Sequence, residues 1–263
     1  MERSLTNNVN ALLKHKITQD NRQELQTEIH PELNFRRNSV NLLIGRRGSG
    51  KTYNVFREMI KLNFVPDHHY SQLIYVTNKL SDDTFHKMKK LMKIEIVKVK
   101  YEDVQECLTK IIEAKEDYAE IVEKSLVNEL DEEYAEELKN TIAVNDFNSP
   151  VVHTAVLFDD AIEVFKNRKS GLYRMLFENR QPKITYFLCL QDPIGIDASV
   201  KSNVDSAWLF GGFSSQKFSY IFHQLNSPYD RQELWNHYKN ISMNQALIFD
   251  HKRTGTTVRI ISE

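Results

Sequence analysis

Cysteine, glycine and proline are scarce in this chain of 263 residues, which contains 2, 8 and 6 of them. Cys107 and Cys189 lie far apart and in no C-x-x-C spacing, which argues against a disulfide framework or a cysteine zinc site and favours a reducing compartment. The few glycines and prolines exclude fibrous, collagen-like and low-complexity architectures. No two of the nine histidines stand in H-x-x-x-H spacing, so the sequence offers no helical histidine metal site.

Long apolar runs and an excess of one charge are also lacking. No run approaches the roughly 20 residues of a membrane span, and the first residues contain no apolar leader segment. We therefore expect a soluble, intracellular protein. With 35 Lys and Arg against 36 Asp and Glu, the net charge of −1 excludes a uniformly basic surface. A hydrophobic content of 41 % and a charged content of 27 % are ordinary for a globular protein with a sizeable core.

The charge is unevenly distributed along the chain. Residues 102–140 contain 14 acidic and 4 basic side chains, a net charge of −10, so the rest of the chain carries +9. Apolar residues are spaced through this segment as in a helix, and we predict an inserted pair of amphipathic helices with an acidic outer face. A net charge close to zero is therefore compatible with a basic main domain that carries an acidic insert.

Residues 1–37 are polar and weakly periodic, and we predict an N-terminal arm with one short helix around residues 9–16. Residues 38–263 form the predicted main domain, in which short apolar runs alternate with helical patterns. The runs are residues 40–44, 72–77, 94–99, 154–158, 184–190, 207–210 and 246–249. This alternation predicts an α/β fold with a mostly parallel central sheet flanked by helices, closed by a C-terminal β-hairpin over residues 246–261.

The most specific motif follows the first of these runs. Gly45-Arg46-Arg47-Gly48-Ser49-Gly50-Lys51-Thr52 satisfies G-x-x-x-x-G-K-[ST], the phosphate-binding loop of P-loop NTPases, between a predicted strand and a predicted helix. Glycines let the backbone N–H groups surround a phosphate at the positive end of the helix. Lys51 can contact the β- and γ-phosphates, and the Thr52 hydroxyl can ligate Mg²⁺. The loop predicts an ATP site with Mg²⁺.

Two further strands end in polar residues of matching chemistry. The run 154–158 is followed by Asp159 and Asp160, at the sheet edge where ligands of parallel sheets bind. We predict that Asp159 holds Mg²⁺ and that Asp160 polarises the attacking water. Gln191 follows the run 184–190 and is predicted to sense the γ-phosphate or that water. The alternatives are helix-capping acids and an ordinary polar residue at a strand end.

An arginine lies shortly before that last strand. Arg180 could stabilise the transition state in its own subunit or, more usefully, in a neighbouring one, because a forked guanidinium suits a transferred phosphate. Arg168 and Arg174 are the next candidates for this role. The alternative for each is an ordinary surface arginine.

The order and spacing of GRRGSGKT, VLFDD and the strand closing on Gln191 resemble viral genome-packaging ATPases of the FtsK/HerA superfamily, of the poxvirus, giant-virus and virophage type. The similarity covers about residues 38–215 and extends through LYRMLFENRQPKITYFLCLQD to SVKSNVDSAWLFGG. It departs from the family where Arg180-Gln181 replaces Arg-His, and where Lys201 stands at a frequent arginine position. A lysine cannot supply a bidentate fork, which shifts the predicted arginine finger toward Arg180.

The resemblance implies an ATPase that moves double-stranded DNA into a capsid, as a homo-oligomeric ring at the viral assembly site in the host cytoplasm. Capsid or portal proteins are the implied partners, and the protein is expected to associate with the virion. Candidate DNA contacts are the lysines at 87, 89, 90, 93, 98 and 100, and Lys252 and Arg253. The acidic insert would repel non-productive DNA or dock a basic capsid protein. The alternatives are a nucleoside or nucleotide kinase and a nucleotide-switched scaffold.

Overall fold

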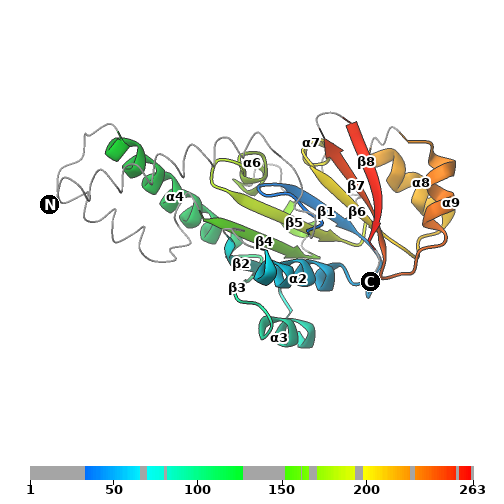
Figure 1. The fold of residues 1–263 in the computed structure, drawn as a ribbon, viewed down its shortest axis with the longest axis horizontal. Helices are drawn as coiled ribbons and strands as arrows, with labels where there is room; N and C mark the ends of the chain where they lie inside the picture. Colours follow the sequence, from blue (N-terminus) through cyan, green and yellow to red (C-terminus); the bar gives the residue numbers. More distant parts are fainter. Residues whose placement is uncertain are drawn as a thin grey trace.

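A central sheet of eight strands organises the protein in the computed structural model, which describes residues 33–65, 70–79, 82–126, 152–160, 162–165, 171–192, 198–225, 229–252 and 255–261. The strands are β1 (Val40–Ile44), β2 (Tyr70–Val76), β3 (Glu95–Val99), β4 (His153–Asp159), β5 (Ile184–Leu190), β6 (Ser206–Phe210), β7 (Ala246–Lys252) and β8 (Gly255–Ile261). Their spatial order is β3-β2-β4-β5-β1-β6-β7-β8 (Figure 1). All seven predicted runs, and the second arm of the predicted hairpin, are strands of this sheet.

The first six strands pair in parallel, and the last two are antiparallel to their neighbours. The predicted α/β fold with a mostly parallel sheet is therefore confirmed, and the C-terminal hairpin is present as an extension of the sheet edge. The continuous apolar run in β4 reflects burial on both faces. Val156 and Phe158 belong to the core on one side of the sheet, and Ala155 and Leu157 to the core on the other.

Helices cover both faces, which gives three layers (Figure 1). Helices α2 (Lys51–Lys61) and α3 (Asp83–Lys89) pack on one face, with the short 3₁₀ turn η1 (Leu62–Phe64). The other face carries η2 (Ile162–Phe165), α4 (Val104–Leu126), α6 (Gly171–Phe177), α7 (Ala198–Ser202), α8 (Ser215–Gln224) and α9 (Arg231–Tyr238). In α2, Val55, Phe56 and Met59 are fully buried, and each such side chain stabilises the fold by about 1.5–3 kcal/mol.

The predicted acidic insert begins as helix α4. Val104, Leu108 and Ile111 face the core, whereas the acidic side chains of residues 102–117 are exposed. This amphipathic helix is the first of the predicted pair, and the rest of the insert lies outside the described residues. No helix in the described part of the chain combines the length and the apolar character needed to cross a membrane.

The last residues of the predicted N-terminal arm pack onto the sheet. Leu33 and Phe35 are buried, and the Phe35 ring lies edge-on to Phe187 with 5.1 Å between the ring centroids. Residues 1–32, including the predicted short helix, lie outside the described residues.

Candidate functional site at the carboxyl edge of the sheet

The phosphate loop occupies the predicted position between β1 and α2. Gly48 and Gly50 have φ angles of 79° and 82°, in the left-handed region that glycine adopts without a steric penalty. At Gly45 a β-carbon would lie 2.4 Å from the Ser49 hydroxyl oxygen and 2.8 Å from Cβ of Phe210. The three glycines of the motif thus each meet a steric demand of this loop.

Lys51 turns back over the loop that precedes it. Its ammonium group donates hydrogen bonds to the carbonyl oxygens of Gly45, at 2.8 Å, and of Arg46, at 3.1 Å. The Ser49 hydroxyl is buried without a hydrogen-bond partner among the described residues. Arg46 and Arg47 are exposed, and the Arg46 guanidinium lies 5.9 Å from the Phe213 ring centroid. The loop therefore exposes two arginines, Arg46 and Arg47, and buries the Ser49 hydroxyl without a partner among the described residues.

The predicted metal pair is brought together. The Thr52 hydroxyl donates a 2.6 Å hydrogen bond to Oδ1 of Asp159, whose side chain is only 2 % exposed. Both groups offer oxygen atoms, which Mg²⁺ prefers, and a magnesium site commonly has few protein ligands and takes the rest from water and phosphate. In the described part of the chain no cluster of three or more His, Cys, Asp or Glu side chains could hold a metal ion by itself. Thr52 and Asp159 therefore fit Mg²⁺ carried in by a nucleotide.

Asp160 and Gln191 are also neighbours. The Gln191 side-chain amide donates to Oδ2 of Asp160 at 3.1 Å, while Oδ1 of Asp160 is buried and has no partner among the residues described. The Asp160 backbone has a φ of 55°, which is uncommon outside glycine, and its N–H donates to the carbonyl of Cys189 at 3.0 Å. One carboxylate oxygen is thus held by Gln191, and the other is a buried acceptor without a donor among the described residues.

Three side chains that we did not predict surround Asp159. Tyr75 in β2 donates to Oδ2 of Asp159 at 3.0 Å, and the Lys79 ammonium lies 2.5 Å from the same oxygen. The Tyr101 hydroxyl donates to the backbone carbonyl of Asp159 at 2.5 Å. Burial, with the negative charges of Asp159 and Asp160, raises the pKa of Tyr101 to about 12. All three residues lie on or just after β2 and β3, whose carboxyl ends reach the same sheet edge, so the strand-end rule applied to those strands could have found them.

Arg180 lies at the other edge of the sheet. It precedes β5 in a turn where the Lys183 N–H donates to its carbonyl, and its guanidinium is 3.4 Å from Asp205, just before β6. Burial raises the pKa of Asp205, and the bonds from the Val40 N–H and Arg180 oppose this rise. A seven-residue strand spans about 20 Å, so the structure does not bring Arg180 to the phosphate loop of its own subunit.

The other cationic candidates are placed as follows. Arg174 is exposed and pairs with Glu178 at 2.9 Å, and Lys201 donates to the side chain of Gln224 at 2.6 Å. Arg168 lies outside the described residues. None of the described arginines outside the loop thus reaches Asp160 within the chain.

Comparison with known proteins gives structural likeness only. No protein-family model matches the sequence, and no curated protein matches it. Among solved structures, the chain is similar to B204, the DNA-packaging ATPase from Sulfolobus turreted icosahedral virus, with a TM-score of 0.52 and 17 % identity over 86 % of this chain and 97 % of B204.

Two further solved structures extend the likeness. B204 of Sulfolobus turreted icosahedral virus 2 in complex with ATP-gammaS has a TM-score of 0.52 and 17 % identity, covering 85 % of this chain and 96 % of that one. ATPases 2 and 3 of EssC from Geobacillus thermodenitrificans have a TM-score of 0.52 and 13 % identity, covering 84 % of this chain and 39 % of that one. The resemblance expected from the motifs is thus confirmed at the level of the fold, which the chain shares with these ATPases.

Proposed function

We propose that the chain is an ATP-hydrolysing motor that moves double-stranded DNA into a viral capsid. The observation that carries the hydrolysis is the arrangement of Asp160, which follows Asp159 in the chain, is held by Gln191 and keeps a second carboxylate oxygen without a partner among the described residues. The fold shared with a DNA-packaging ATPase supports the choice of DNA as the substrate that is moved.

The residues divide the chemistry between them. The loop N–H groups and Lys51 would bind the β- and γ-phosphates, and Thr52 and Asp159 would hold Mg²⁺. When bound, Mg²⁺ supplies Lewis-acid neutralisation of the phosphate oxygens. Asp160 accepts a hydrogen bond from the attacking water at its free oxygen, and Gln191 holds Asp160 in that orientation. An acid in this position favours hydrolysis of ATP. It argues against a kinase, which would transfer the phosphate to a nucleoside.

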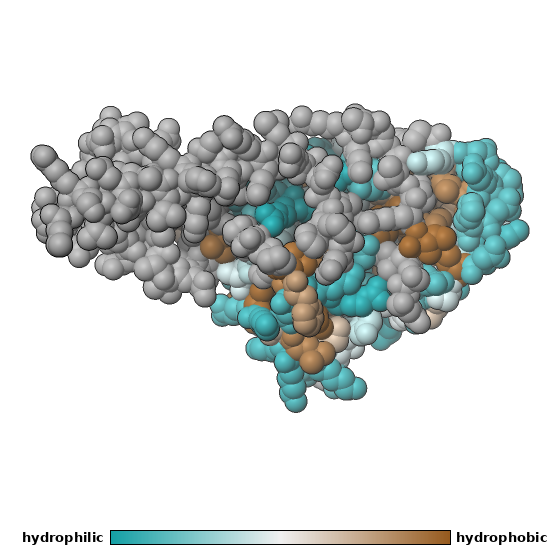
Figure 2. Space-filling model, viewed as in Figure 1, coloured by the Kyte–Doolittle hydropathy of each residue, from teal (hydrophilic) through white to brown (hydrophobic). Residues whose placement is uncertain are grey.

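The exposed lysines of α3 and of the turn that follows it favour this surface as the DNA contact. Lys87, Lys89, Lys90 and Lys93 are exposed, and none of them forms an ion pair within the described residues. Helix α3 projects from the body of the molecule, and its tip is hydrophilic (Figures 1 and 2). Contacts between lysines and DNA phosphates are independent of sequence, as a motor requires. Lys100 instead pairs with Glu102 at 3.3 Å, and the predicted contact at Arg253 lies outside the described residues.

The assembly in this proposal is a closed homo-oligomeric ring at a capsid vertex, at the viral assembly site in the host cytoplasm. A closing head-to-tail interface repeats the same contact at every subunit boundary. An exposed arginine such as Arg180 can then serve the ATP site of a neighbour. The exposed acids of α4 would face a basic capsid protein or repel DNA from the outer surface.

The test is the ATPase rate with and without double-stranded DNA, with nucleosides offered as phosphate acceptors. We expect stimulation by DNA and no phosphorylated nucleoside. Asp160→Asn should bind ATP normally and lose about 10²–10⁴-fold in turnover, because the amide cannot accept the water proton. Asp83→Asn, which changes an exposed acid of α3, is the matched control. Lys51→Ala should lose nucleotide binding.

Two outcomes would contradict the proposal. Rapid phosphorylation of a nucleoside with no response to DNA would indicate a kinase. Nucleotide binding without turnover in the wild-type protein, with and without DNA, would indicate a switch or scaffold.

A further inference from the structure

The carboxylate of Asp159 accepts hydrogen bonds from three side chains of the protein itself. Oδ1 accepts from Thr52 at 2.6 Å, and Oδ2 accepts from Tyr75 at 3.0 Å and from Lys79 at 2.5 Å. With 2 % of its side chain exposed, Asp159 has almost no contact with water. A buried charge is tolerated only when it is paired and hydrogen-bonded, so Lys79 supplies the counter-charge of the metal-binding carboxylate.

The backbone of Lys79 is fixed by hydrogen bonds, whereas its side chain is half exposed. Its N–H donates to the Thr77 hydroxyl at 3.2 Å, and its carbonyl accepts from Lys98 at 2.5 Å. The side chain is 50 % exposed, and a lysine side chain has four rotatable carbon–carbon bonds. A charged ammonium group can therefore move at this site while its backbone stays in place.

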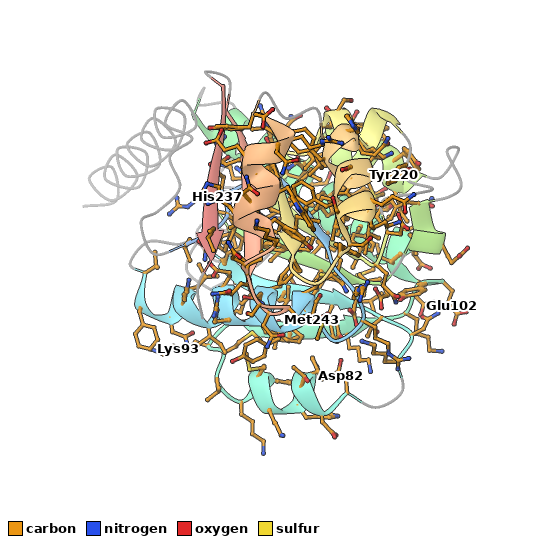
Figure 3. The ribbon with its side chains drawn as sticks, turned by 90° about the vertical axis from the view of Figure 1, so that its right-hand side faces the viewer. Asp82, Lys93, Glu102, Tyr220, His237 and Met243 are labelled. Atoms are coloured by element: carbon orange, nitrogen blue, oxygen red, sulfur yellow. The ribbon has the colours of Figure 1, made fainter. Side chains whose placement is uncertain are left out.

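A second acid makes the position of Lys79 depend on the metal site. The Tyr75 hydroxyl lies 2.6 Å from Asp82 as well as 3.0 Å from Asp159, so its one proton faces two carboxylates. Figure 3 shows Asp82 where α3 meets the rest of the molecule. Without Lys79, these two acids would repel each other across Tyr75 unless another cation neutralised Asp159. A metal ion held by Thr52 and Asp159 would supply such a cation and would allow Lys79 to leave.

We propose that Lys79 is a second lysine of the nucleotide site, which moves from Asp159 to the γ-phosphate when ATP and Mg²⁺ bind and so distinguishes ATP from ADP. This inference rests on the proposed function only in that the site binds ATP. Thr52 bonds to one oxygen of the Asp159 carboxylate and Lys79 to the other, so the ammonium group lies one carboxylate away from the hydroxyl that would hold the metal ion. When Lys79 leaves Asp159 it loses an anionic partner, and the γ-phosphate would replace that partner.

The experiment compares the affinities for ATPγS and ADP by calorimetric titration, once with Mg²⁺ and once with EDTA. We expect the wild-type protein to prefer ATPγS in Mg²⁺ and to lose much of that preference in EDTA. Lys79→Met should lower the preference for ATPγS in Mg²⁺ about tenfold or more, the worth of a hydrogen bond to a charged group, with little change for ADP. Lys79→Arg should keep most of it. Lys239→Met, which removes an exposed lysine in the turn after α9, is the control.

The alternative is that Lys79 only neutralises Asp159. Lys79→Met would then lower the melting temperature of the nucleotide-free protein and strengthen Mg²⁺ binding, while the ratio of ATPγS to ADP affinity in Mg²⁺ stayed at the wild-type value. An unchanged ratio overturns the inference, whatever happens to the melting temperature. A wild-type protein that binds neither nucleotide would instead overturn the proposed ATP site.

Discussion

Asp160 combines an uncommon backbone φ angle with a carboxylate oxygen that has no partner among the described residues. A non-glycine residue in a sparsely populated backbone region costs about 1–3 kcal/mol and persists only where its surroundings hold it. Here the Asp160 N–H bonds to Cys189 and its side chain to Gln191. At the residue scale, these bonds thus maintain a strained turn in which one Asp160 carboxylate oxygen has no donor among the described residues.

The glycines of the phosphate loop allow a matched comparison. In Gly45→Ala the new methyl group meets Phe210 at 2.8 Å, and we expect a loss of about 1–3 kcal/mol in unfolding free energy from overpacking, together with a large loss of nucleotide affinity. Gly48→Ala meets nothing within 4 Å and should lose only the roughly 1–2 kcal/mol of a left-handed backbone. Urea unfolding and nucleotide titration measure both effects. Equal nucleotide affinity in the two variants would show that the space around Gly45 does not shape the loop.

At the scale of elements, the site is built where parallel strands end. Thr52 follows β1, Tyr75 and Lys79 belong to the end of β2, and Asp159 closes β4. The Asp82 side chain caps α3 by accepting from the Phe85 N–H at 3.0 Å and also accepts from Tyr75. Helix α3, which carries the exposed lysines, is thus linked by hydrogen bonds to the metal-binding strand end.

The lysines of α3 and the following turn should account for part of the salt dependence of DNA binding. Changing Lys87, Lys89, Lys90 and Lys93 together to Gln removes up to four phosphate contacts, and each contact contributes about 0.9 to the slope of log affinity against log salt. We expect the slope to fall by about 3 to 4, equally for DNA of any sequence, as measured by fluorescence anisotropy. Lys239→Gln, an exposed lysine in the turn after α9, is the control. An unchanged slope would remove α3 from the DNA interface.

At the scale of the whole molecule, the two edges of the sheet hold different groups of predicted site residues. The carboxyl edge holds the loop, Asp159 and Asp160. The amino edge holds Arg180 beside Asp205, and Arg36 in an ion pair with Asp250. In the proposed ring, the distance between the edges would restrict a catalytic role of Arg180 to the site of another subunit. The side chain is 63 % exposed, as such a use requires.

Mixing two inactive variants tests that use. Arg180→Ala should assemble and bind ATP but lose about 10³-fold or more in turnover, the contribution of an arginine finger, while Lys51→Ala should lose nucleotide binding. Subunits of the first kind keep a complete loop, and subunits of the second kind keep the arginine. Mixed assemblies should therefore recover part of the DNA-stimulated ATPase rate. Full activity of Arg180→Ala alone would show that Arg180 is an ordinary surface residue.

The sequence alone determined the parts that are local in the chain. The phosphate loop, the Asp159–Asp160 pair and the strand ending before Gln191 are contiguous patterns. Apolar runs marked seven of the eight strands, because strands buried in a sheet are rich in apolar residues, and the hairpin pattern marked the eighth. The role of Asp160 as the water-activating acid, and of Gln191 as the sensor of the γ-phosphate or the attacking water, stays a prediction; the structure shows that the two side chains bond to each other.

The tertiary structure decided which strand ends meet. Lys79, Tyr75 and Tyr101 surround Asp159 because β2 lies between β3 and β4, and crossover connections do not encode the spatial order of parallel strands. Arg180 appeared close to the site when only chain distance to Gln191 was considered, yet one strand length separates the two edges of a sheet. The sequence could therefore name the chemistry at each strand end, and only the packing of the strands could show which of these groups act on one another.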